Sequence, residues 1–102
     1  MLSLMRVIAG TLRGHRLYGP RKLALRPTSA RVREALFSIL GNRLTNSRLL
    51  DVYAGTGAVG IEAVSRGAEH VTSVESSRNA LKLLRQNLEL DRLEAEVVGG
   101  AV

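Results

Sequence analysis

The sequence predicts an α/β fold in which the strands of a parallel sheet alternate with helices. Three short apolar runs, at about 48–53, 71–75 and 95–98, indicate buried strands. The two segments between them have helical character, and right-handed crossovers join strands in such units. A hairpin and a helix are expected before the first strand. The chain therefore predicts an incomplete parallel sheet that follows an N-terminal segment with a different structure.

The first element expected is a β-hairpin within residues 5–18. Its two strands flank a turn at 10–14, and Gly19-Pro20 ends the second strand. A hairpin of this size is not stable alone, so it has to dock on another part of the chain. His15 is expected to be a surface imidazole, because no second histidine or acid stands near it to form a site.

A helix is expected next, capped by Thr28 or Ser29 and ended by Gly41 after about Leu40. Pro27 keeps the residue before it extended. Apolar side chains fall on one face of this helix and are expected in the core, with two arginines off that face: Val32, Ala35, Leu36, Ile39 and Leu40 inside, Arg31 and Arg33 outside.

Two more helices are expected between the strands. The first runs to about Arg66, where Gly67 ends it, and Thr56 is its expected N-cap. The second is capped by Ser76 or Ser77, and its apolar stripe is expected to be core: Leu81, Leu84 and Leu88.

Charge divides the chain into two expected domains, 1–48 and 49–102. The first carries ten basic residues and one acid, or +9, and the second carries five basic and eight acidic residues, or −3. A basic front half predicts an anionic macromolecular partner, nucleic acid first, although a solvated basic surface is the alternative.

Composition narrows the class of protein. The 102 residues include no cysteine, so thiolate metal sites and disulfides are excluded, and no apolar run approaches the length of a membrane span. We expect a cytoplasmic protein with no membrane partner and no metal site.

A glycine-rich loop follows the first parallel strand, with the spacing Gly55-x-Gly57-x-x-Gly60. Strand, tight turn and helix in this order are typical of nucleotide-type binding loops. The first two glycines let the backbone turn and a ligand approach, and Gly60 lets the helix pack close to the strand.

Two acids flank this loop. Glu75, twenty residues after Gly55, ends the second strand, where a carboxylate can accept both hydroxyls of an adenosine ribose. Asp51 precedes the loop, where it suits a cationic ligand such as S-adenosylmethionine better than a pyrophosphate. This disfavours a nicotinamide-dependent oxidoreductase. A plain glycine turn with two solvated acids is the alternative.

Several motifs together closely resemble the bacterial 16S ribosomal RNA guanine-N2 methyltransferase family. They cover most of the chain in the order Arg6-Val7-Ile8-Ala9-Gly10, Arg26-Pro27-Thr28, Arg31 to Leu40, Asp51-Val52-Tyr53-Ala54-Gly55-Thr56-Gly57 and Glu62 to Ala68. The family's threonine and aspartate are replaced by Leu25 and Ala30.

The resemblance implies a Rossmann-like class I methyltransferase fold, with S-adenosylmethionine as cofactor and 16S RNA or the assembling small ribosomal subunit as partner. The cofactor-binding residues expected are Asp51, Ala54, Gly55, Thr56, Gly57, Gly60, Glu75 and Ser76. The RNA-binding residues expected are Arg13, Arg16, Arg26, Arg31 and Arg33. A DNA methyltransferase fragment and a non-catalytic RNA-binding module are the rival interpretations.

One departure from the family concerns catalysis. Its Asn/Asp-Pro-Pro-aromatic motif is absent, because the only prolines are Pro20 and Pro27. We therefore assign no catalytic residue, and we expect an amino-terminal piece of the enzyme that is inactive alone. The uncovered edge of the strand at 49–53 is expected to make this piece self-associate.

Overall fold

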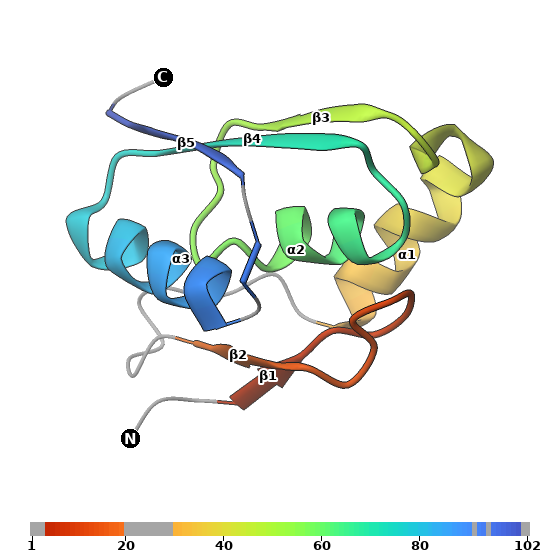
Figure 1. Ribbon diagram of the computed structural model, residues 1–102, viewed down its shortest axis with the longest axis horizontal. Helices are drawn as coiled ribbons and strands as arrows, with labels where there is room; N and C mark the ends of the chain where they lie inside the picture. The colour runs from red at the N-terminus through yellow and green to blue at the C-terminus, as the bar shows by residue number, and fades with distance from the viewer. Residues whose placement is uncertain (1–3, 20–29, 91, 94, 101–102) are drawn as a thin grey trace.

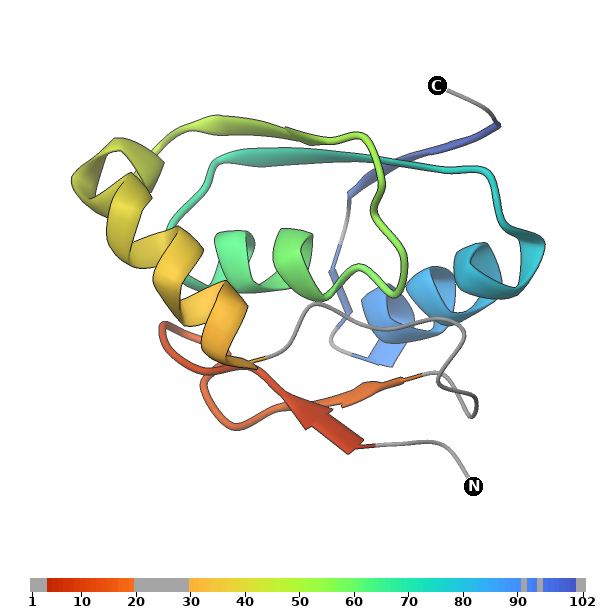
Figure 2. The ribbon, with the colours of Figure 1, turned by 180° about the vertical axis from the view of Figure 1, so that it is seen from behind.

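Three stacked layers make up the fold (Figures 1 and 2). The computed structural model describes residues 4–19, 30–90, 92–93 and 95–100. In Figure 1 a sheet lies at the top, two helices lie beneath it, and a hairpin lies beneath the helices.

The sheet contains β3 (Arg48–Asp51), β4 (His70–Glu75) and β5 (Glu96–Gly99). The strands are parallel in the order β3-β4-β5, with Thr72 opposite both Leu50 and Glu96. This confirms the predicted alternation of strands and helices. Within the described part of the chain, the outer edge of β3 has no neighbouring strand.

Both crossover helices, α2 (Ala58–Ser65) and α3 (Arg78–Leu90), cover the same face of the sheet (Figure 1). A Cβ built on Gly60 would lie 3.0 Å from Val71 Cγ1, so the predicted close packing of helix on strand is confirmed. The apolar face of α3 is turned to the core as expected, with Leu84 fully buried and Leu81 and Leu88 half-buried. Ser77 caps α3, since its Oγ accepts the Ala80 N–H at 3.3 Å.

The N-cap of α2 is Gly57, so the prediction that Thr56 caps this helix was wrong. Gly57 has φ 83°, a left-handed conformation that favours glycine, and a Cβ there would clash with Leu84 Cδ1. Thr56 is instead buried one residue earlier.

The hairpin, β1 (Leu4–Arg6) with β2 (Arg16–Tyr18), was predicted to dock on another part of the chain, and it docks on the helices. Its buried Val7 and Leu17 pack in one apolar cluster with α2 residues, among them Ile61. Burial of these side chains supplies the stabilisation that an isolated hairpin lacks.

Buried polar groups on α2 fix the position of this hairpin. The Glu62 carboxylate accepts the N–H groups of Ile8 at 2.9 Å and Ala9 at 3.0 Å. Ser65 Oγ donates to the Ala9 carbonyl at 2.6 Å and accepts the Leu12 N–H at 2.9 Å. Each of these bonds satisfies backbone groups that have no partner within the two short strands.

Helix α1 (Ala30–Leu40) continues into a 3₁₀ turn, η1 (Gly41–Leu44), and Gly41 ends the α-helix with φ 52°. The predicted core face of α1 is wrong, because most of its apolar side chains are exposed. Val32 is 56% exposed and Ile39 71%. The proposed N-caps of α1, Thr28 and Ser29, lie outside the described residues.

Arg33 and Phe37 are the buried side chains of α1: Arg33 meets Glu62 of α2, and Phe37 packs in an apolar cluster that includes Ala63. Arg33 donates to the Arg6 carbonyl at 3.0 Å and lies 3.7 Å from the Glu62 carboxylate. The Arg66 guanidinium stacks over the Phe37 ring, 4.9 Å from its centroid. The inner face of α1 is therefore set by an apolar cluster at Phe37 together with the carboxylate that faces Arg33.

None of the helices in the described ranges is long and apolar enough to cross a membrane.

Candidate functional site

The glycine loop lies at the carboxyl ends of β3 and β4, the edge of a parallel sheet where ligands bind. Ala54 N–H donates to the Val74 carbonyl at 3.0 Å, which ties the loop to β4. Gly57 N–H donates to the Ala54 carbonyl at 2.9 Å and closes the turn. A Cβ at Gly55 would meet nothing within 4 Å, so one side of the loop is open.

Glu75 spans the mouth of this loop. Its Oε1 accepts the Gly55 N–H at 2.7 Å, and its Oε2 accepts the Ser77 N–H at 2.8 Å. Each carboxylate oxygen retains a second lone pair, so the group is held in place and can still accept two hydroxyls.

Asp51 ends β3 on the other side of the loop. Its Oδ1 accepts the Tyr53 N–H at 3.3 Å. Burial raises the pKa of Asp51; the Tyr53 hydrogen bond opposes this, and the negative charge of Glu75 adds to it. Two carboxylates therefore share the loop, and their mutual repulsion favours a cationic ligand.

The structure brings most of the predicted cofactor-binding residues to this one loop. Asp51, Ala54, Gly55, Thr56, Gly57 and Glu75 line or frame it, and Ser76 is exposed beside Glu75. Gly60 differs, because it lies inside α2 against Val71 and Ser73 rather than at the open side of the loop.

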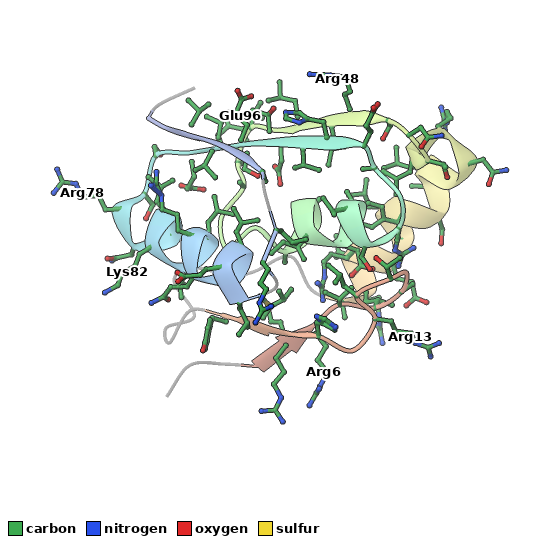
Figure 3. All side chains as sticks on the ribbon, in the orientation of Figure 1. Arg6, Arg13, Arg48, Arg78, Lys82 and Glu96 are labelled. Atoms are coloured by element: carbon green, nitrogen blue, oxygen red, sulfur yellow. The ribbon has the colours of Figure 1, made fainter. Side chains whose placement is uncertain are left out.

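The predicted RNA-binding arginines do not form one group. Arg13, Arg16 and Arg31 are exposed, and Figure 3 shows Arg13 pointing away from the body of the molecule. Arg33 is only 2% exposed, so its predicted role as a surface contact is corrected to an internal one. Arg26 lies outside the described residues.

Burial also shows in the electrostatics of Arg33. Desolvation lowers its pKa, the charge of Glu62 opposes this, and the positive charge of Arg66 adds to it. The Arg66 Nε donates to Glu62 at 2.8 Å, so one carboxylate serves two guanidinium groups. Glu62 was not predicted as an internal partner, although a lone acid within the apolar run Ile61 to Val64 was a signal for it.

Asn87 is a second residue that the sequence analysis missed. It is fully buried, and its Oδ1 accepts the Tyr18 N–H at 2.6 Å. Its Nδ2 donates to the carbonyls of Tyr18 at 3.0 Å and Thr56 at 2.8 Å. One amide thus joins the hairpin, α3 and the glycine loop. The available signal was an amide within the apolar stripe of Leu84 and Leu88.

Within the parts of the chain that the structure describes, histidine, aspartate and glutamate side chains form no cluster of three that could hold a metal ion.

Comparison with known proteins places this loop in a family. The family model described as conserved hypothetical protein 95 matches residues 5–100. The ribosomal RNA small subunit methyltransferase D of Escherichia coli K12 is 43% identical over 84 residues, which are 82% of this chain and 42% of that protein. The chain thus spans less than half the length of this relative.

Solved structures share the fold. The Escherichia coli protein yhhF matches with a TM-score of 0.85 and 36% identity over 97% of this chain and 53% of its own. A Pyrococcus abyssi tRNA (uracil-54, C5)-methyltransferase, solved with S-adenosyl-L-homocysteine, has a TM-score of 0.68 over 98% of this chain and 24% of its own. At 20% identity, that second match concerns the fold alone.

The predicted Rossmann-like class I methyltransferase fold is therefore confirmed. So is the resemblance noted in the sequence: the chain belongs to the conserved hypothetical protein 95 family, and its relatives include ribosomal RNA small subunit methyltransferases.

Proposed function

We propose that this chain carries the cofactor-binding half of an enzyme that methylates the N2 amine of a guanine in 16S ribosomal RNA. The observation that carries the proposal is the pair of acids, Asp51 and Glu75, held on either side of an open glycine loop. The 43% identity to a small subunit methyltransferase supports the RNA substrate.

S-adenosylmethionine fits the hydrogen-bond acceptors that the loop presents. The Glu75 oxygens accept backbone N–H groups and have lone pairs left for the two ribose hydroxyls. Asp51 lies nearby as an acceptor for the ammonium of the methionine part. When bound, the cofactor supplies an activated sulfonium methyl group, and the contribution of these residues is orientation.

RNA binding falls to the exposed arginines of the N-terminal segment in this proposal. Arg13 and Arg16 lie on the hairpin, and Arg31 lies in the first turn of α1. The RNA that these arginines would bind is 16S RNA, free or in the assembling small subunit. The proposed enzyme acts in the cytoplasm. The division into a basic segment at 1–48 and a cofactor-binding segment at 49–102 belongs to the same proposal.

No residue of the 102 is proposed to catalyse the transfer, so the chain alone is expected to be inactive. The rest of the site is assigned to the part of the relatives that this chain does not span.

Titration with S-adenosylhomocysteine tests the ribose assignment. The change Glu75→Ala should weaken binding by roughly thirty- to hundredfold, since two hydroxyl contacts to a carboxylate contribute about 2–3 kcal/mol. Glu69→Ala is the matched control, because Glu69 is an exposed acid at the opposite end of β4.

Because Glu75 also holds the Gly55 N–H, a second ligand separates the two roles. S-adenosylhomocysteine without its 2′-hydroxyl should bind the wild type less tightly than the parent compound. The Glu75→Ala variant should bind this ligand and the parent compound with equal affinity. Equal affinities of the wild type for both ligands would refute the ribose contact.

A further inference from the structure

We infer that the exposed face of α3 formed by Arg78, Lys82 and Arg85, called the α3 stripe below, binds phosphates of the RNA substrate. This inference rests on the proposed function. It adds a second RNA-binding surface, on a different element from the hairpin and α1.

The three cations lie on one side of the helix. Their spacing of four and then three residues places them on adjacent turns of one helix face. All three are exposed. Figure 3 shows Arg78 and Lys82 projecting from α3 away from the body of the molecule, on the same side. The stripe is therefore accessible to a large ligand.

The arrangement of charges on α3 destabilises the helix. Arg78 and Lys82 are like charges four residues apart, and Lys82 and Arg85 are three apart, so each pair repels. The first turn holds no acid and the last turn no base, whereas Glu89 stands near the carboxyl end. Cations near the amino end and an acid near the carboxyl end both oppose the helix dipole.

Glu89 stands four residues after Arg85, but the two side chains form no ion pair. Across residues 4–19, 30–90, 92–93 and 95–100, none of the three cations forms an ion pair or hydrogen bond. The second half of the chain carries a net charge of −3, so the stripe is a local concentration of positive charge and not an effect of composition. A charge pattern that costs helix stability is accounted for by an anionic ligand that needs it.

The position of the stripe points to the RNA substrate. Arg78 follows Glu75 by three residues, so the stripe begins where β4 ends, beside the proposed cofactor site. In Figure 1 the start of α3 and the carboxyl ends of β3 and β4 lie on the same side of the molecule. RNA phosphates bound there would hold the RNA next to the methyl donor.

The test compares salt dependence. The triple variant R78A/K82A/R85A and the control R92Q are titrated with an unmodified 16S ribosomal RNA transcript at several salt concentrations. Arg92 is exposed and follows the carboxyl end of α3, at the opposite end of the helix from Arg78, and it lies outside the basic segment at 1–48. Losing three phosphate contacts should reduce the slope of log affinity against log salt by about 2 to 3.

The control should leave that slope within about 0.5 of the wild type. The triple variant should also melt at a higher temperature than the wild type, because repulsion is relieved and alanine favours helix. Loss of RNA binding without loss of stability separates a binding surface from a structural one. The variant R78K/K82R/R85K, which keeps the charges, should restore the slope.

An unchanged slope in the triple variant would overturn the inference. The inference would also be overturned if the triple variant lost binding to polyglutamate but still bound RNA like the wild type. That result would assign the stripe to an acidic protein partner. S-adenosylhomocysteine binding, measured on the same samples, should not change. A wild type that binds RNA through the stripe but binds no S-adenosylhomocysteine would refute the proposed cofactor function and leave the stripe standing.

Discussion

At Asp51, the proposed ligand binding and the stability of the fold place opposite demands on one carboxylate. Burial raises its pKa, so the native state holds its proton more tightly than the unfolded chain does. Stability therefore falls as pH rises through the range between the unfolded and folded pKa values, and the ionised group is a cost at neutral pH. A cationic cofactor would offset that cost when it binds.

The change Asp51→Asn should therefore raise the melting temperature at pH 7 while weakening S-adenosylhomocysteine binding. Asparagine keeps an oxygen for the Tyr53 N–H and removes only the charge. The gain should vanish below about pH 3.9, where aspartate is protonated in the unfolded chain as well. Thermal melts at both pH values check this, with Glu69→Gln as the exposed control. A lower melting temperature at pH 7 would contradict it.

Some residues of the site were predictable and others were not, for reasons of distance along the chain. Asp51 and Glu75 stand at the ends of two recognisable strands, and parallel strands bring those ends together. Asn87 has no such signal. Its partners Tyr18 and Thr56 lie 69 and 31 positions away, and neither pairing follows from any local period.

At the scale of elements, the prediction from the sequence was correct for the strands and wrong for the buried face of helix α1. Apolar runs predicted all three parallel strands to within about two residues, because both faces of such a strand are normally covered. In α1 the apolar periodicity predicted the wrong face. Periodicity locates an apolar stripe, but the neighbouring element decides what is buried, and α2 offers Glu62, with Arg66 just after its last residue.

The junction of the hairpin with α2 can be tested at two glycines. Gly10 has φ 92° and Gly14 has φ 84°, so alanine at either costs about 1–2 kcal/mol of backbone strain. A Cβ at Gly10 would also overlap the Ser65 carbonyl, whereas a Cβ at Gly14 would meet nothing within 4 Å.

Gly10→Ala should accordingly destabilise the protein by about 1–3 kcal/mol more than Gly14→Ala, the usual range for overpacking. Urea unfolding of the two variants measures the difference. Equal losses would mean that the hairpin moves away from α2 without cost.

At the scale of the whole molecule, β3 and α1 both carry large apolar side chains that are exposed. Both lie on the near side in Figure 2. Leu50 is 62% exposed, Tyr53 79% and Ile39 71%. The open edge of β3, which carries the exposed Leu50, is suited to pairing with a second copy of the chain.

Sedimentation over a range of concentrations should therefore show self-association of the 102-residue chain. Leu50→Lys should reduce it, because a charge on an edge strand opposes pairing. Val98→Lys, at an exposed position on β5 at the other edge of the sheet, is the control and should not reduce it. A monomer at every concentration would rule out the open edge of β3 as an interface.

The bonds of Asn87 also have a consequence for synthesis on the ribosome. Tyr18 is made 69 residues before Asn87, which binds both its N–H and its carbonyl. At about 5–20 residues per second, the hairpin waits roughly 3–14 s after its own synthesis for that partner. An element made before its partner helix is thus among the last to reach its native position.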